Sequence, residues 1–184
     1  LRVDGKLLVD SGVSINAPSI AATGCSVGTR QGFSIIKYEG DGSPGTIPHG
    51  LSQTPDFAIV KNLEESEHWG VYHKSEGGTR YAFLNSDNAF SASSALWNDT
   101  DPTSLLFSLG DYNGTNKDNI DFIAYLWHDV PGLQKFGSYT GNGNTSDDGP
   151  FIELGFRPAI IWFKRAEDNG YNWNCYDTTR SNTG

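Results

Sequence analysis

The sequence lacks methionine altogether, and it has few cysteines, few basic residues and no long apolar run. Its 184 residues include two cysteines, 13 lysines and arginines, and 22 aspartates and glutamates, which give a formal net charge of −9. Nucleic acid and anionic membranes both attract basic surfaces, so this charge argues against either as a partner. No apolar run approaches the roughly 18 residues of a membrane-spanning helix. We therefore expect no nucleic-acid partner and no membrane span.

The two cysteines, Cys25 and Cys175, lie far apart in dissimilar contexts and show no metal-ligand spacing. Two buried free thiols are the favoured interpretation, and a disulfide is the alternative. The absence of methionine, even at position 1, leads us to expect that the chain is an internal fragment of a longer protein.

Glycine and aromatic residues are abundant, with 22 glycines and 12% Phe, Trp and Tyr. Apolar runs bounded by turn residues predict short strands over 33–38, 57–61, 68–73, 81–84, 105–109 and 120–128. The last of these carries apolar side chains on both faces, which indicates a central strand between two layers. No segment of a dozen residues has helical apolar spacing behind an N-cap. The sequence therefore predicts an all-β fold, an antiparallel β-sandwich or a jelly-roll-like arrangement, with almost no helix.

Two stretches of the chain share one pattern, and the second is cut short. The matched positions are Phe33/Phe136, Tyr38/Tyr139, Gly40/Gly141, Gly42/Gly143, Leu51/Leu154, Pro55/Pro158, Lys61/Lys164, Trp69/Trp173 and Tyr72/Tyr176. Self-similarity on this scale indicates repeated supersecondary units. We expect a first β-sandwich unit over 32–132 and a truncated second copy over 133–184, which again suggests a fragment.

The first unit is preceded by a segment of different character over 1–31. Apolar residues flank Asp4-Gly5, a strong signal for a tight hairpin turn, so a hairpin is predicted over 1–12. Residues 13–29 are low in charge, rich in Ser, Ala and Gly, and include Pro18. We interpret that stretch as an extended linker.

Catalytic residues do not emerge from the sequence. The four histidines share no ligand spacing, and His128-Asp129 could orient an imidazole, but no Ser or Cys nucleophile motif accompanies it. The acidic residues lie in turns among Asn and Gly, unlike the two facing carboxyls that a glycosidase needs. We therefore expect no enzyme.

One tryptophan stands apart from the predicted strands. Trp97 lies beside turn residues, and an exposed ring next to Asn98, Asp99 and Asp101 could stack on a sugar. These four residues are the candidate ligand site. The alternative, which the sequence favours, is a loop anchor buried under the sandwich.

Asp111, Asn113 and Asp118 are the candidate metal ligands, because this stretch begins like a calcium loop. The glycine expected at the sixth position is Asn116, and the glutamate expected at the twelfth is Phe122, so the stretch is not an EF-hand. Solvated turns are the favoured interpretation. Calcium in a non-standard site stays the alternative, and no other cofactor is expected.

Four strings of the sequence resemble a domain that recurs in virion proteins of tailed phages, especially marine phages and cyanophages. They are 32–40 (GFSIIKYEG), 49–55 (HGLSQTP), 123–143 (IAYLWHDVPGLQKFGSYTGNG) and 154–160 (LGFRPAI). The resemblance covers about residues 7 to 184, nearly the whole chain. It implies a β-rich particle component, in tail-fibre-like or other surface-exposed proteins, and brings no catalytic residues with it.

The resemblance and the repeat together lead to an expectation of a non-enzymatic structural protein exposed on a phage particle and assembled in the host cytoplasm. Expected partners are other virion proteins, further copies of the chain, and a glycan or receptor of the host surface. A carbohydrate-binding, lectin-like module is the alternative, and a lectin-fold glycosidase is a weaker one.

Overall fold

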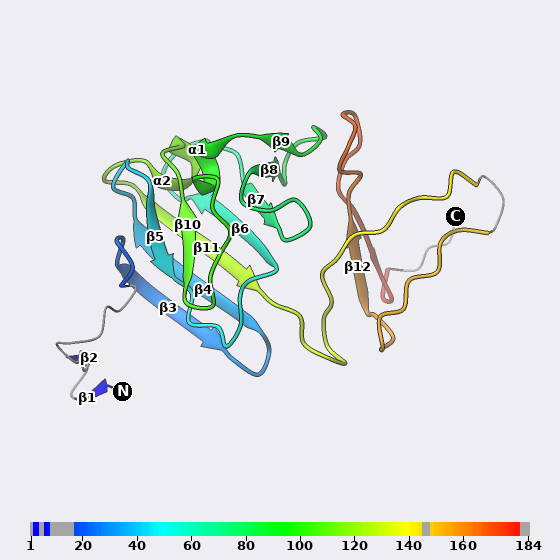
Figure 1. The fold of residues 1–184 in the computed structure, drawn as a ribbon, viewed down its shortest axis with the longest axis horizontal. Helices are drawn as coiled ribbons and strands as arrows, with labels where there is room; N and C mark the ends of the chain where they lie inside the picture. The colour runs from blue at the N-terminus through cyan, green and yellow to red at the C-terminus, as the bar shows by residue number, and fades with distance from the viewer. Residues whose placement is uncertain (1, 4–5, 8–16, 145–147, 181–184) are drawn as a thin grey trace.

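Figure 1 shows the computed structural model of the chain, which describes residues 2–3, 6–7, 17–144 and 148–180. Strands make up 34% of it and helices 5%, so the prediction of an all-β fold is confirmed. The strand pairs are antiparallel, in the main sheet and in the smaller sheets alike. Among the described residues, no helix is long and apolar enough to cross a membrane.

Seven strands form the main sheet in the order β3-β4-β11-β6-β7-β8-β9. Their bounds are β3 (Ala22–Gly28), β4 (Phe33–Glu39), β6 (Phe57–Asn62), β7 (Gly70–His73), β8 (Arg80–Phe83), β9 (Ser91–Ala92) and β11 (Asp121–Trp127). β11 pairs with β4 on one side and β6 on the other. The central strand predicted over 120–128 is thus confirmed.

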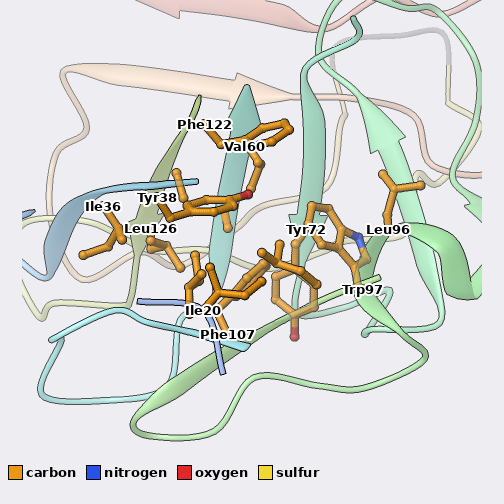
Figure 2. Packing of buried hydrophobic residues seen from close by; sticks show 14 of the residues in the cluster. Ile20, Ile36, Tyr38, Val60, Tyr72, Leu96, Trp97, Phe107, Phe122 and Leu126 are labelled. Carbon is orange, nitrogen blue, oxygen red and sulfur yellow. The ribbon is translucent and has the colours of Figure 1, made fainter. Parts of the chain in front are cut away.

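A second layer covers one face of this sheet. It consists of the paired strands β5 (Gly45–Pro48) and β10 (Leu106–Leu109), with two short helices, α1 (Ser94–Trp97) and α2 (Asn113–Asn116). The main core lies between the layers, and Figure 2 shows its largest side chains, Tyr38, Trp97, Phe107 and Phe122. Each fully buried large apolar side chain contributes about 1.5–3 kcal/mol.

The other face of the main sheet carries a second apolar cluster built on Phe57, Ile59, Val71, Ala82 and Phe90. Side chains from the second copy pack against it, namely Phe136, Ala166 and Trp173. The rings of Phe57 and Phe136 are stacked, with centroids 5.6 Å apart. The second copy thus covers the outer face of the sheet that the first copy forms.

The repeat is reproduced as a hairpin with the same strand register. β12 (Ile160–Phe163) pairs with β13 (Asn174–Asp177) so that Trp162 lies opposite Cys175. In the first copy β6 pairs with β7 so that Ile59 lies opposite Val71, the positions matched by the sequence repeat.

Two further observations show the same equivalence. Lys74 N donates to Asp56 O at 2.8 Å, and Thr178 N donates to Ala159 O at 3.0 Å, at the same place beside the two hairpins. Gly42 and Gly143 both adopt the left-handed region, with φ of 70° and 67°, which favours glycine in each turn.

Another part of the repeat is not reproduced. The matches Phe33/Phe136 and Tyr38/Tyr139 predict an aromatic strand from Phe136 that is equivalent to β4. This prediction is wrong, because the structure has no strand between residues 136 and 142. In the first copy β4 lies between β3 and β11 and pairs with both. A strand needs such a neighbour, and none of the described residues supplies one to the second copy.

The amino-terminal segment departs from expectation in part. β1 (Arg2–Val3) pairs with β2 (Lys6–Leu7) in antiparallel fashion, as the predicted hairpin requires, and the expected turn at Asp4-Gly5 lies outside the described residues. Residues 8–12 of the expected hairpin, and the start of the linker at 13–16, lie outside the described residues. The prediction of a linker is wrong for Ala22–Gly28, because these residues form β3, an edge strand that pairs with β4.

Both cysteines are free and exposed. The prediction that the two thiols are free is confirmed, and the prediction that they are buried is wrong. Cys25 lies on the edge strand β3, and Cys175 lies on the hairpin β12–β13, where neither side chain reaches a core.

Candidate functional site

The predicted ligand site centres on a tryptophan that the structure places in the core. Trp97 is 0% exposed and makes edge contacts with the rings of Tyr72 and Phe107, with centroids 6.3 and 5.3 Å away. Its ring has no free face on which a sugar could stack. The buried loop anchor, the alternative from the sequence, is what the structure shows.

A short helix fixes this ring in place. Ser93 Oγ accepts a hydrogen bond from Ala95 N at the start of α1, as an N-cap should. Asn98 ends the helix in the left-handed conformation with φ of 54°, and Asp99 follows with φ of 47°. The sequence did not predict this helix, because four residues are too few to show a helical period.

Asp101 has a structural role in the first unit. Its Oδ1 accepts a hydrogen bond from Gly78 N at 2.7 Å and from the hydroxyl of Tyr72 at 3.4 Å. Burial, and then the Asp101 carboxylate, raise the pKa of the Tyr72 hydroxyl. Asn98 and Asp99 are exposed beside it. The four residues of the candidate ligand site are therefore divided between core, hydrogen-bond network and solvent.

The predicted metal ligands surround α2. Asn113 begins the helix, and its carbonyl oxygen accepts a hydrogen bond from Asn62 Nδ2 at 3.2 Å. Asp118 accepts one from Asn119 Nδ2 at 2.7 Å, and Asp111 is exposed. In the described part of the chain, no group of three or more His, Cys, Asp or Glu side chains could hold a metal ion. Calcium binding here stays a prediction.

Asn116 replaces the glycine of a calcium loop, and the structure shows what it does instead. The residue is fully buried, and its Nδ2 donates to Ser43 O at 2.6 Å and to Gly110 O at 2.9 Å. Its Oδ1 accepts from Asp41 N at 3.1 Å. The side chain thus joins three loops at one end of the sandwich.

A serine and a histidine that the sequence keeps far apart meet near the other end of β11. Ser52 Oγ lies 3.4 Å from His128 Nε2, and His128 Nδ1 lies 2.7 Å from the carbonyl oxygen of Asp129. His128 is 2% exposed. The pair resembles a nucleophile and its base, but the group that orients the imidazole is a backbone carbonyl rather than a carboxylate.

His49 lies close to this pair and has a structural role. It is fully buried, its Nδ1 accepts from Leu51 N at 3.1 Å, and its Nε2 lies 3.1 Å from Thr103 O. Burial lowers the pKa of His49, the hydrogen bond to Thr103 opposes that shift, and the nearby His128 adds to it. Both ring nitrogens already have partners, so His49 has no atom left to serve the Ser52 and His128 pair.

The carboxylate of Asp129 is committed to the junction between the two copies. Its Oδ1 accepts from Phe136 N at 2.6 Å, and its Oδ2 forms ion pairs with Lys74 at 3.2 Å and Lys135 at 3.3 Å. Burial alone would raise the pKa of Asp129, but these hydrogen bonds and charges outweigh it and lower that pKa. Asp56, which also pairs with Lys74, accepts from Asp129 N at 2.6 Å.

A pocket of about 230 Å³ lies beside this junction, between residues 129–135 and 154–156. Pockets for small organic ligands usually have about 300–1,000 Å³ and a mostly apolar lining. The junction pocket is smaller and its rim carries the Asp129 and Lys135 charges. Its geometry favours a structural joint over a substrate site.

The fold defines the chain as an all-β sandwich protein with a repeated hairpin. A family model described as a domain of unknown function (DUF7483) matches residues 9–184, and the chain therefore belongs to the DUF7483 family. No curated protein and no solved structure matches the chain.

Proposed function

We propose that the chain is a non-enzymatic structural component of a tailed-phage particle, displayed outward as a fibre, an appendage or a decoration. The observation that carries the proposal is the repeated hairpin, in which β12–β13 has the register of β6–β7. Repeats of this kind build extended proteins in which each unit contacts its neighbour. The phage setting comes from the resemblance of residues 32–40 and 123–143 to virion proteins.

The arrangement of side chains supports a role in presentation. The apolar residues form two clusters on the main sheet, while Asn98, Asp99 and Asp111 stand on exposed loops. Loops held by a rigid frame are where proteins carry recognition. Other virion proteins, further copies of the chain and a host-surface glycan or receptor are the partners in this proposal.

The contacts of the polar residues also favour a structural role over catalysis. An active site needs a nucleophile or an acid–base pair, held by a third group beside a pocket. The Ser52 and His128 pair is held by a backbone carbonyl, and the Asp129 carboxylate next to it is occupied by Lys74, Lys135 and Phe136 N. The proposal therefore assigns these residues to the fold.

Antibody labelling of intact particles tests the proposal. Gold-labelled antibodies raised against the purified chain should bind at one defined place on particles of the phage that encodes it. Particles pre-incubated with the free chain as competitor should lose the label. Absence of label on intact and on gently disrupted particles would contradict a virion role.

A further inference from the structure

At one end of the sandwich, His49 joins two loops of the first unit, 49–55 and 102–105. The residue follows β5 and is fully buried. Its Nδ1 accepts a hydrogen bond from Leu51 N at 3.1 Å, and its Nε2 lies 3.1 Å from Thr103 O, in the loop before β10. We call the His49 ring and these two backbone partners the His49 latch.

The two hydrogen bonds of the latch fix which ring nitrogen of His49 carries the proton. A backbone N–H only donates, so Leu51 N requires a bare Nδ1, and a carbonyl oxygen only accepts, so Thr103 O requires an N–H at Nε2. Neutral His49 satisfies both partners. An imidazolium carries a proton on both nitrogens and would set Nδ1–H against the N–H of Leu51. The closed latch therefore excludes a second proton on His49.

His128, the neighbouring buried imidazole, has the opposite arrangement. Its Nδ1 lies 2.7 Å from the carbonyl oxygen of Asp129, so this nitrogen carries a proton in the neutral ring. Its Nε2 lies 3.4 Å from Ser52 Oγ, a hydroxyl that can either donate or accept. A second proton on His128 therefore costs neither partner. Of the two rings, His49 is the one with a hydrogen bond that protonation must break.

No carboxylate compensates for a charge on His49 in the described part of the chain. Burial lowers the pKa of His49, its backbone hydrogen bond raises that pKa, and the charge of His128 lowers it further. The acids on adjoining segments, Asp56, Asp101 and Asp129, are bonded to other partners. The titratable group that faces His49 is thus a second cation-forming ring.

Loop 49–55 can leave its place without a change in the main sheet. Its side chains at 52–54 are exposed, and Leu51 is the residue that anchors it in the main core. The strands β5 and β10 pair at Pro48 and Leu106, so they hold the bases of both loops together. Leu105, whose carbonyl oxygen accepts from His49 N, already exposes 57% of its surface.

We propose that the His49 latch opens in mild acid: His49 takes a second proton from solvent, gives up its bond to Leu51 N, and releases loop 49–55 from loop 102–105 while the main sheet stays folded. The released loop exposes Leu51 beside Leu105, an apolar surface that the closed latch hides. The inference concerns the first unit alone and does not depend on the proposed virion role.

Two nuclear magnetic resonance measurements on the full chain test the latch. Nitrogen-15 spectra of the histidine rings, recorded near neutral pH, report which nitrogen of His49 is protonated. Amide hydrogen exchange then compares Leu51 with Ala124, in the centre of β11 and paired on both sides, as the pH is lowered. Each rate is divided by the intrinsic rate at that pH, which gives a protection factor.

The expected ring spectrum shows His49 protonated at Nε2 and bare at Nδ1. Protection of the Leu51 amide should fall about tenfold between about pH 7.5 and pH 5.5, because an open imidazole with a pKa near 6.5 gains that factor one pH unit lower. Leu51 should be less protected than Ala124 throughout, as a local opening requires. His49→Gln should remove the pH dependence at Leu51, whereas His68→Gln, at an exposed histidine, should retain it.

The reverse tautomer of His49 overturns the inference. Equal protection of Leu51 and Ala124 at every pH also overturns it, because the latch then opens only when the whole unit unfolds. A protection factor of Leu51 that does not change with pH, or that changes equally in folded His49→Gln, has the same consequence. If His49→Gln fails to fold, the two measurements on the natural chain decide alone.

Discussion

The indole N–H of Trp173 donates a hydrogen bond of 3.1 Å to the carbonyl oxygen of Phe83, and so joins the second hairpin to a strand of the first sheet. The ring of Trp173 also lies against Phe57, with centroids 6.3 Å apart. Trp69, its match in the first copy, packs against the same outer cluster. The two matched tryptophans thus pack against the same apolar cluster.

Substitution of Trp173 should therefore separate the hydrogen bond from the packing. We expect Trp173→Phe to lower the free energy of unfolding by about 1 kcal/mol, the worth of one hydrogen bond. Trp173→Ala should lower it by about 2–3 kcal/mol, somewhat less than for a fully buried ring. Urea denaturation measures both. Tyr139→Ala, at a position 52% exposed, is the control and should change stability by less than about 0.5 kcal/mol. Equal effects of Trp173→Ala and the control would mean that the hairpin does not stabilise the first unit.

Asn116 should be among the most sensitive polar positions in the chain. Asn116→Ala leaves Asp41 N, Ser43 O and Gly110 O without their partner inside the protein. We expect a loss of about 2–4 kcal/mol, because the buried Gly110 carbonyl and two partly buried backbone groups lose their partner together. The exposed Asn88 offers a matched control, Asn88→Ala, with an effect near zero. A small effect at Asn116, with the structure otherwise intact, would show that water replaces the side chain.

How much of this the sequence could predict depends on the kind of residue. The strand β11 was predictable, because the sequence of this segment places apolar side chains on both faces of a strand, which is typical of a central strand. β3 was not, because a strand of small residues at a sheet edge carries no periodic signal. The site residues were harder still. Trp97 is buried by contacts with Tyr72 and Phe107, which lie far from it in the chain, and no local pattern records such contacts.

The protein should lose stability in mild acid through its buried histidines. Burial lowers the pKa values of both His49 and His73 below the ordinary value. Below about pH 6.5 the unfolded chain therefore binds protons that the folded chain does not, and folding becomes less favourable as the pH falls. The free energy of unfolding is therefore at its full value above about pH 6.5, and it falls as the pH drops toward the lowered pKa values of the two histidines in the folded state. Unfolding measured from pH 7.5 to pH 5 should show this slope.

The variant His49→Gln separates this slope from other titrations. Glutamine keeps polar contacts near Leu51 N and Thr103 O but takes up no proton, so the decline between about pH 6.5 and pH 5 should be shallower. An unchanged slope would mean that His49 does not contribute. The lowered pKa of Asp129 acts in a separate, more acidic window, because that carboxylate stabilises the fold until it is protonated.

Asp129 should control the junction between the copies. Asp129→Asn keeps an acceptor for Phe136 N but removes the charge that pairs with Lys74 and Lys135. These ion pairs are partly exposed, so we expect a loss of only about 1 kcal/mol in global stability. Hydrogen exchange at the Phe136 amide should nevertheless become faster, while exchange in β11 is retained. Unchanged protection at Phe136 would contradict a role for the Asp129 charge in the joint.

The central claim is that this chain is part of an assembled phage particle, and mass spectrometry of purified particles tests it most directly. Particles of the encoding phage are separated from the lysate on a density gradient, and peptides of the chain are quantified in each fraction. The account predicts that peptides from both copies, for example from 121–127 and 160–163, sediment with the infectious particles in a constant ratio to known virion proteins. Peptides found only in the soluble lysate, together with turnover of a glycan by the purified chain, would contradict it.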